Sequence, residues 1–305
     1  MNHVFEVCPD LLHVAGKFKG VLLDAYGVFW GGNDVGLLPG SKNVMEALVA
    51  SRKIVGILSN ATQMPANEIK KFDRHGLLQD KHFHFVVTSG EVARSIFLAE
   101  DLPFKTPRKT YWLFCGAHPK FATHEAIFKE TGYREVPQIE DADFIYISTP
   151  HLLGEDQTDP ELFRDAIAKV KGKNLPMICP NPDQFAHEGK PPRSVVRQGT
   201  IAKMYEAMGG HVFYIGKPHA TAYAAALREF RHHNVVNLEE ILMVGDTPET
   251  DIRGANLVGL ASALVLTGNM GDRIARKGFE NALKELTPQD TPTYFVHGLH
   301  SSSKP

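Results

Sequence analysis

The 305-residue sequence predicts an α/β fold, in which a doubly wound core with a parallel sheet is interrupted by an inserted α/β domain. The first observation behind this prediction is that apolar runs typical of buried strands, such as residues 20–23 and 54–58, alternate with segments whose apolar residues recur at helical spacing. Successive βαβ units of this kind form a parallel sheet covered on both faces. The second observation is that the alternation of strand and helix starts afresh at about residue 90, and that the strand ends typical of the core return at Lys217 and Asp246. We therefore expect a core domain at 1–88 and 211–305 and an inserted domain at 89–210.

The core elements before the insertion follow from local residue patterns. Ser41 is expected to cap a helix because a serine hydroxyl accepts a backbone N–H, and Val44 and Leu48 then recur at helical spacing. Ile69 and Phe72 supply the apolar stripe of the next helix. In chain order we expect strands at 20–23, 54–58 and 83–87, with helices that start at Ser41 and at about residue 66.

The inserted segment repeats the alternation of strand and helix. The alternative is one large continuous sheet, but an insertion is favoured because the strand-end pattern of the core returns at Lys217 and Asp246. Within the insertion we expect strands at 111–115, 144–148 and 176–179 and helices near 121–131, 160–171 and 200–208. The core then resumes with strands at 212–215, 241–244 and 293–296 and a helix near 274–286.

Polar side chains stand at the carboxyl ends of several predicted core strands. They are Asp24, Ser59 with Asn60, Lys217, and Asp246, which is followed five residues later by Asp251. Each has an ordinary explanation by itself, because a serine can cap a helix, a lysine can be solvated and an acid can open a helix. In open α/β sheets, however, the carboxyl ends of the strands form the ligand site. Together these residues predict three carboxylates, a hydroxyl and an ammonium around one point.

This set of groups suits the chemistry of a phosphoryl group with Mg²⁺. Mg²⁺ takes hard oxygen ligands and keeps several waters, so two or three carboxylates are enough to bind it. Ser59 and Lys217 would hold and neutralise the phosphoryl oxygens, which leaves one carboxylate to attack phosphorus. The residues therefore predict a site for a magnesium ion and a small phosphorylated compound.

Four short motifs strengthen this prediction. The most specific is Gly-Asp-x-x-x-Thr-Asp-Ile-x-Gly-Ala, which occupies residues 245–255. The others are Gly-Lys-Pro at 216–218, Asn-Pro-Asp at 181–183 and Leu-Thr-Gly at 266–268. Their order and content resemble the haloacid dehalogenase (HAD) superfamily of aspartyl-nucleophile phosphohydrolases, specifically its class IIA group. The resemblance spans roughly residues 17–268.

The resemblance implies a Rossmann-like core, a cap formed by the insertion, and Mg²⁺-dependent hydrolysis of a small phosphorylated metabolite such as a sugar phosphate. It makes Asp24 the nucleophile and places the metal between Asp24, the backbone carbonyl of Tyr26 and Asp246. Asp251 would orient a metal-bound water. It also implies a homodimer joined through the cap. The residues expected to contact the substrate are Ser59, Asn60, Asn181, Asp183 and Lys217, with the loop at 181–189 facing the leaving group.

Tyr26 is the one departure from the family pattern. Phosphatases of this superfamily carry a second aspartate two residues after the nucleophile, where it acts as general acid and base, and this chain has tyrosine there. The backbone carbonyl can still bind the metal, but proton transfer by a carboxyl group is lost, so turnover is expected to be slow. Two alternatives therefore stay open. The first alternative is a haloacid dehalogenase, because Asp-x-Tyr-Gly is the form that the first motif takes in the haloacid dehalogenases themselves. The second is a non-catalytic protein that binds a phosphoryl ligand and has lost turnover.

The composition excludes several other classes of function. The chain has 33 basic and 35 acidic residues, a formal net charge of −2, which argues against a general nucleic-acid or membrane-surface partner. Its first residues lack the basic and apolar segments of a secretory signal, and no apolar run approaches the roughly 20 residues that span a bilayer. The three cysteines, Cys8, Cys115 and Cys179, have no metal-ligand spacing. We therefore expect a cytoplasmic protein with reduced cysteines.

Overall fold

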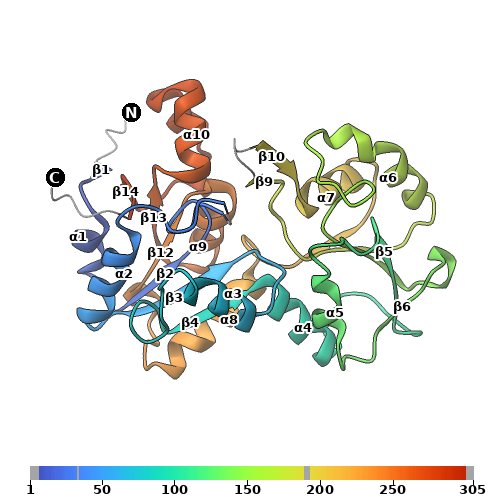
Figure 1. Ribbon diagram of the computed structural model, residues 1–305, viewed down its shortest axis with the longest axis horizontal. Helices are drawn as coiled ribbons and strands as arrows, with labels where there is room; N and C mark the ends of the chain where they lie inside the picture. The colour runs from blue at the N-terminus through green and yellow to red at the C-terminus, as the bar shows by residue number, and fades with distance from the viewer. Residues whose placement is uncertain (1–6, 33, 189–192, 300–305) are drawn as a thin grey trace. The chain divides into compact units, whose positions relative to one another are not determined.

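The computed structural model describes residues 7–32, 34–188 and 193–299, and the chain divides into two compact units (Figure 1). The core unit comprises Met1–Ser59, Ala66–Val87 and Lys217–Pro305, and the inserted unit comprises Asn60–Pro65 and Thr88–Gly216. These boundaries differ from the expected ones in three places, 60–65, residue 88 and 211–216, all of which belong to the inserted unit.

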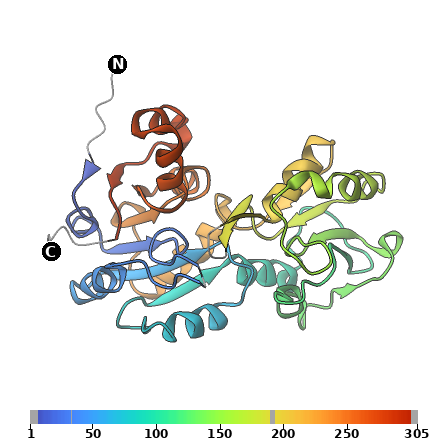
Figure 2. The ribbon, with the colours of Figure 1, turned by 45° about the horizontal axis from the view of Figure 1, so that its top comes forward.

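The core unit is built around a seven-stranded sheet with the order β1-β14-β13-β12-β2-β3-β4. The strand pairs from β1 to β3 are all parallel. N-terminal strands, blue to teal, therefore share one sheet with C-terminal strands, orange to red (Figure 2). The predicted α/β class with a parallel-sheet core is confirmed. The strands are β1 (Val7–Cys8), β2 (Gly20–Leu23), β3 (Ile54–Ser59), β4 (Phe85–Thr88), β12 (Ile241–Gly245), β13 (Ala261–Val265) and β14 (Tyr294–Val296).

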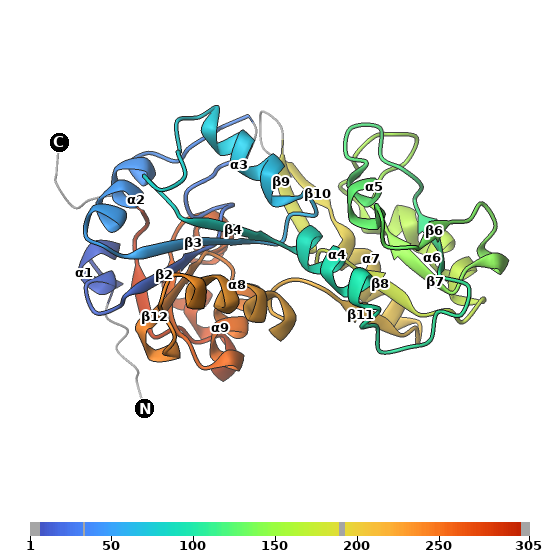
Figure 3. The ribbon, with the colours of Figure 1, turned by 90° about the horizontal axis from the view of Figure 1, so that it is seen from below.

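Helices cover both faces of this sheet. Figure 3 shows α2 and α3 on one face of β2, β3 and β4, with α8 and α9 on the other. The central strands β2 and β12 are buried along their whole length, as expected for strands covered on both faces. The helices are α1 (Leu11–Ala15), α2 (Ser41–Ala50), α3 (Pro65–Asp73), α8 (Ala220–His232), α9 (Arg253–Val258), α10 (Gly268–Lys277) and α11 (Phe279–Lys284). Shorter helical turns lie at Leu238–Glu240, Pro248–Ile252 and Pro288–Asp290.

The predicted capping role of Ser41 is wrong. Helix α2 begins at Ser41 itself, and the cap position is Gly40, which has a φ of 81° and no side-chain hydrogen bond to the helix. The turn before the helix requires this left-handed backbone, which glycine adopts without steric strain. As a result the Ser41 side chain is buried inside the first turn and cannot reach the helix end from outside.

The inserted unit has its own five-stranded sheet, in which all four neighbouring strand pairs are parallel and the order is β11-β8-β7-β5-β6. Helices α6 and α7 pack on one face around Ile167, Ile201 and Tyr205. Aromatic rings fill the other side, where Tyr111 stacks on Phe128 at a centroid distance of 3.8 Å. The strands are β5 (Thr110–Phe114), β6 (Arg134–Glu135), β7 (Phe144–Ile147), β8 (Met177–Cys179) and β11 (Val212–Tyr214), and the helices are α4 (Ser89–Ala99), α5 (Thr123–Phe128), α6 (Arg164–Lys171) and α7 (Gln198–Ala207). Single turns lie at Ile139–Asp141 and Pro160–Phe163.

Two sequence-based predictions fail in this unit. The strand predicted at 212–215 is expected beside the core strands, but β11 pairs with β8, with Val212 opposite Met177. The segment at 181–189 was expected to be a loop, but Phe185–Glu188 is strand β9, which forms an antiparallel hairpin with β10 (Arg193–Val196). Residue 189 lies outside the described residues. Strands of three or four residues carry too little local pattern to reveal either that they are strands or which strand they pair with, and this explains both errors.

Among the described residues, none of the helices combines the length and the apolar character that crossing a membrane requires.

Candidate functional site

The two central strands of the core unit bring Asp24 and Asp246 to the same edge of the sheet. Strand β2 pairs with β12 so that Leu23 lies opposite Val244, and the backbone N–H of Asp24 donates to the carbonyl of Val244 at 2.8 Å. Asp24 and Asp246 each follow their strand directly, at its carboxyl end. The predicted proximity of these two carboxylates therefore follows from the register of the sheet.

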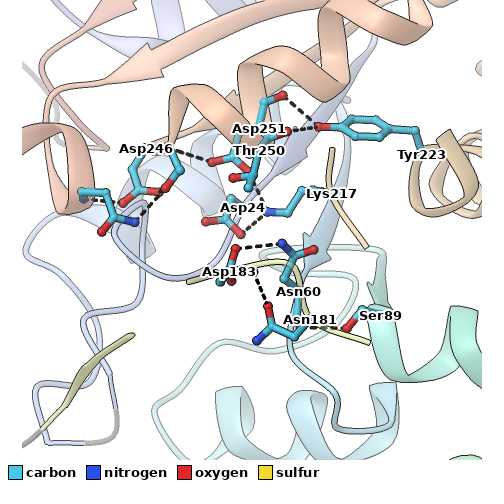
Figure 4. Close-up of polar contacts among 12 residues, drawn as sticks. Asp24, Asn60, Ser89, Asn181, Asp183, Lys217, Tyr223, Asp246, Thr250 and Asp251 are labelled. Carbon is cyan, nitrogen blue, oxygen red and sulfur yellow. Dashed lines mark hydrogen bonds and ion pairs between the residues drawn. The ribbon is translucent and has the colours of Figure 1, made fainter. Parts of the chain in front are cut away.

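Lys217 and Asp251 complete a buried charge cluster with these two residues (Figure 4). The Nζ of Lys217 lies 2.5 Å from Oδ1 of Asp24 and 2.7 Å from Oδ1 of Asp251. Carboxylate oxygens of Asp24, Asp246 and Asp251 all lie within 4.8 Å of one another. The prediction that Lys217 follows a core strand is wrong. Its ammonium nevertheless lies beside the carboxylates of Asp24 and Asp251, because the chain re-enters the core unit at Lys217.

Asp251 is held from three sides. Its Oδ2 accepts the backbone N–H groups of Asp246 and Thr247 at 3.1 and 3.0 Å, and its carbonyl accepts the hydroxyl of Tyr223 at 2.8 Å (Figure 4). A Cβ at Gly245 would lie 2.1 Å from the Cβ of Asp251. Glycine is therefore required at the end of β12 for the turn to fold back against the strand.

Asp246 is fixed by hydrogen bonds from two residues, of which Asn269 lies outside the motifs that the sequence analysis identified. Its Oδ2 accepts the backbone N–H of Asn269 at 2.7 Å, and its Oδ1 accepts the hydroxyl of Thr247 at 2.9 Å. A Cβ at Gly27 or Gly268 would lie 2.1 or 2.0 Å from this carboxylate, and both glycines have positive φ. Burial, together with the nearby charges of Asp24 and Asp251, raises the pKa of Asp246 well above its usual range.

The charges and the donor types of this cluster fit a divalent cation. With all three carboxylates ionised and Lys217 protonated, these four buried side chains together carry a net charge of −2, which a bound divalent cation would offset. Its ligand atoms are hard carboxylate oxygens, the type that Mg²⁺ binds.

Ser59 and Tyr26 lie on the two strand ends next to this cluster. Ser59 ends β3, which pairs with β2 so that Ile57 lies opposite Leu23, and its side chain is buried. The Tyr26 ring is 40% exposed, and its Oη accepts a hydrogen bond from Nζ of Lys71 at 3.3 Å. Burial lowers the pKa of Lys71, but Tyr26 and Glu68 raise it by more, so this side chain is an ammonium. Sequence patterns gave no signal for Lys71, which lies 45 residues from Tyr26.

The remaining predicted substrate contacts form a network within the inserted unit. The Nδ2 of Asn60 donates to Oδ1 of Asp183 at 2.9 Å, and the backbone N–H of Asp183 donates to Oδ1 of Asn181 at 2.9 Å (Figure 4). The carbonyl of Asn60 accepts the hydroxyl of Ser89 at 2.7 Å. The structure thus joins Asn60, Asn181 and Asp183 in one unit and the charge cluster in the other.

Comparisons with known proteins agree with this architecture. A family model described as HAD-hydrolase-like matches residues 214–301. The chain is 31% identical over 129 residues to a dihydroxyacetone phosphatase from Corynebacterium glutamicum (strain R), a match that spans 41% of this chain and 44% of that protein. The chain therefore matches less than half the length of this curated relative.

Solved structures match nearly the whole chain. A hydrolase of the haloacid dehalogenase-like family from Brucella suis 1330 has a TM-score of 0.77 at 22% identity, covering 96% of this chain and all of that one. A glycerol phosphate phosphatase from Mycobacterium tuberculosis, solved in complex with magnesium, has a TM-score of 0.63 at 22% identity, covering 94% of this chain and 77% of that one. At these identities the likeness establishes the fold.

Proposed function

We propose that this chain is a haloacid dehalogenase-like hydrolase, and specifically a Mg²⁺-dependent phosphohydrolase in which Asp24 attacks phosphorus; the family-model match over residues 214–301 supports this. The observation that carries the proposal is the buried cluster of Asp24, Asp246, Asp251 and Lys217 at the carboxyl edge of the core sheet. The phosphatase activity named for the curated relative is consistent with it.

In the proposed reaction, an Asp24 oxygen forms a bond to phosphorus while the bond from phosphorus to the leaving oxygen breaks. Lys217 contacts Asp24 and is placed to offset negative charge on the phosphoryl oxygens, and Ser59 donates a hydrogen bond to one of them. Asp24, Asp246 and the backbone carbonyl of Tyr26 would hold Mg²⁺, with Asp251 beside them. When bound, the ion would offset the charge of the carboxylates and of the phosphoryl group.

The second step is the hydrolysis of the aspartyl-phosphate. Water attacks phosphorus, the bond to Asp24 breaks, and free carboxylate and inorganic phosphate are released. Residue 26 carries no carboxyl group, so the leaving oxygen of the first step takes its proton from solvent, and the attacking water of the second step gives its proton to solvent. General acid catalysis contributes about 10²–10⁴-fold in typical enzymes, and turnover is therefore expected to be slow for strongly basic leaving groups.

The proposal extends to substrate, assembly and location. We assign a small phosphorylated metabolite as substrate, with Asn60, Asn181 and Asp183 of the inserted unit as further substrate contacts. A homodimer through the inserted unit and a cytoplasmic location complete the proposal. All three cysteines are unbridged, which is consistent with a reducing compartment.

The test is phosphate release from a panel of sugar phosphates, nucleotides and aryl phosphates, with Mg²⁺ or with EDTA. We expect release only with Mg²⁺, and we expect Asp24→Asn to abolish it because an amide does not attack phosphorus. Asp34→Asn is the matched control, since Asp34 is exposed and lies ten residues away in the sequence.

Three outcomes would reject the proposal. Full turnover by Asp24→Asn would show that Asp24 is not the nucleophile. Halide release from 2-haloacids without phosphate release would favour a dehalogenase. Stabilisation by phosphorylated ligands without any turnover would favour a binding protein.

A further inference from the structure

A ring of aromatic side chains surrounds the ammonium of Lys71. Its Nζ lies 5.0, 5.2 and 4.9 Å from the ring centroids of Tyr26, Trp30 and Phe72. These distances are within the range of cation–π attraction. Trp30 and Phe72 are fully buried, whereas Tyr26 is 40% exposed. Tyr26 therefore forms the outer wall of an aromatic cage around a charge.

Two polar contacts orient this ammonium within the cage. Nζ lies 2.5 Å from Oε2 of Glu68, a carboxylate on the same helix whose side chain is 4% exposed. Nζ also donates to Oη of Tyr26 at 3.3 Å. A buried ion pair with aromatic walls restricts the motion of a lysine side chain far more than a solvated pair does. Lys71 is therefore a fixed point on α3 against which Tyr26 packs.

The loop that follows Asp24 carries two of the walls of this cage and is closed by its own backbone hydrogen bonds. Gly27 N–H donates to the carbonyl of Trp30 at 2.8 Å, and Trp30 N–H donates to the carbonyl of Ala25 at 2.9 Å. Two of the three aromatic residues of this loop, Tyr26 and Trp30, lie within cation–π distance of the ammonium of Lys71, and the third, Phe29, packs edge-on against Phe72. The side chain of Lys71 thus ties a loop that starts at the nucleophile to α3.

We infer that Lys71 is a positioning residue that locks Tyr26 against α3, so that residue 26 presents a fixed aromatic wall where phosphatases of this family present a carboxyl group. The inference rests on the proposed function. It assigns the substrate class as phosphoryl compounds whose leaving oxygen is weakly basic, such as aryl or acyl phosphates, because no carboxyl group at position 26 protonates that oxygen. Glu68 acts through Lys71, and neither residue touches the reacting atoms.

The experiment is a double-mutant cycle between Lys71 and Tyr26, measured as kcat/KM on 4-nitrophenyl phosphate and glycerol phosphate. Residues in contact depart from additivity, and we expect Lys71→Met to lower kcat/KM on 4-nitrophenyl phosphate about tenfold. In the Tyr26→Ala background the same change should alter it less than about twofold. Lys71→Arg should restore most of the activity because it keeps the charge and the ring contacts. Lys70→Met is the control, since Lys70 is an exposed neighbour on α3.

A second readout does not depend on turnover. Amide hydrogen exchange of Gly27 and Trp30 should be faster in Lys71→Met than in the parent protein and unchanged in Lys70→Met. Absence of phosphate release from every substrate would overturn the proposed function, while the exchange result would still decide whether Lys71 fixes the loop.

Three results would overturn the inference while leaving the proposed function intact. Equal effects of Lys71→Met in the two Tyr26 backgrounds would mean that the residues are independent. Unchanged exchange at Gly27 and Trp30 would mean that Lys71 does not fix the loop. Equal kcat/KM for glycerol phosphate and 4-nitrophenyl phosphate would remove the assigned substrate class.

Discussion

Replacing Asp246 with asparagine should stabilise the protein in the absence of metal. Asp246 lies within 4.8 Å of two other buried carboxylates, and the ammonium of Lys217 bonds to both of those, Asp24 and Asp251. The pKa of Asp246 is raised by burial and by these two neighbours. Its ionised form is therefore unfavourable in the folded protein unless a cation is bound. Asparagine has nearly the same shape and no charge.

The magnitude follows from Coulomb's law. Two unit charges 4.8 Å apart repel by about 3.5 kcal/mol at an effective dielectric constant of 20. The attraction of the Lys217 ammonium cancels the repulsion from roughly one of the two neighbouring carboxylates, so the repulsion from about one carboxylate remains. Asparagine weakens the bonds from Asn269 and Thr247, which costs about 1–2 kcal/mol. The expected gain is about 2 kcal/mol, or roughly 4–8 °C in Tm for a unit of this size.

The sign of the pH dependence follows from the direction of the shift. Because the folded pKa is raised, the native state binds more protons than the unfolded state above the unfolded value near 3.8. In the absence of metal, the free energy of unfolding of the parent protein should fall as pH rises through the folded pKa of Asp246. The Asp246→Asn variant should lack this pH dependence. The assay is thermal unfolding in EDTA at pH 6 and pH 8, repeated with Mg²⁺, which should stabilise the parent more than the variant.

Asp290 provides the matched control because it is a buried carboxylate with the opposite environment. Burial raises its pKa, but bonds from Arg253 and Thr287 lower it by more. Arg253 donates to both of its oxygens at 2.7 and 2.8 Å. Asp290→Asn should therefore destabilise the protein by about 1.5–3 kcal/mol. If Asp246→Asn also lowered Tm in EDTA at pH 8, or gained as much from Mg²⁺ as the parent, the charge argument would be refuted.

Three further predictions test other parts of the structure. Tyr26→Asp should raise turnover of alkyl phosphates more than that of aryl phosphates, by up to about 10²-fold if the new carboxyl acts as an acid, and loss of all activity in Tyr26→Phe would instead give the phenol a catalytic role. Burial is the main cause that lowers the pKa values of His82, His118 and His124. The free energy of unfolding should therefore decrease as pH falls below about 6.5, by up to roughly 1.4 kcal/mol per pH unit for each histidine. A urea-unfolding midpoint that stays constant between pH 7.5 and 5.5 would contradict this. Light scattering at micromolar concentrations should give the mass of a dimer, and a monomeric mass would end that prediction.

Much of the charge cluster was predictable because its signals are local. Asp24 and Asp246 each end an apolar run, and the strands carrying them are long enough to be recognised without knowing their partners. Parallel strands then place both carboxylates at one edge. Asp251 follows within the same short turn, and the glycine before Asp246 marks the close approach of that turn.

The rest depends on contacts between distant segments. Strand β11 has only three residues, and nothing in them distinguishes a core partner from β8. Glu68 and Lys71 stand at the i,i+3 spacing of an ordinary pair on a helix surface. Their burial, and the contact of Lys71 with Tyr26, arise only when α3 packs over the loop after β2. Pairing and packing of this kind are set by tertiary structure, so a single sequence does not reveal them.

The three carboxylates of the cluster are oriented by several different parts of the chain, and these contacts fix them close together. Lys217 holds Asp24, the backbone of the turn after β12 holds Asp251, and the start of α10 holds Asp246 through Asn269. Gly27 and Gly268 leave the space that Asp246 fills, since a methyl group at either position would overlap its carboxylate. Directional bonds and exclusion of alternative rotamers therefore oppose the mutual repulsion of the charges. A cation entering this site meets ligands already in position, so little reorganisation opposes its binding.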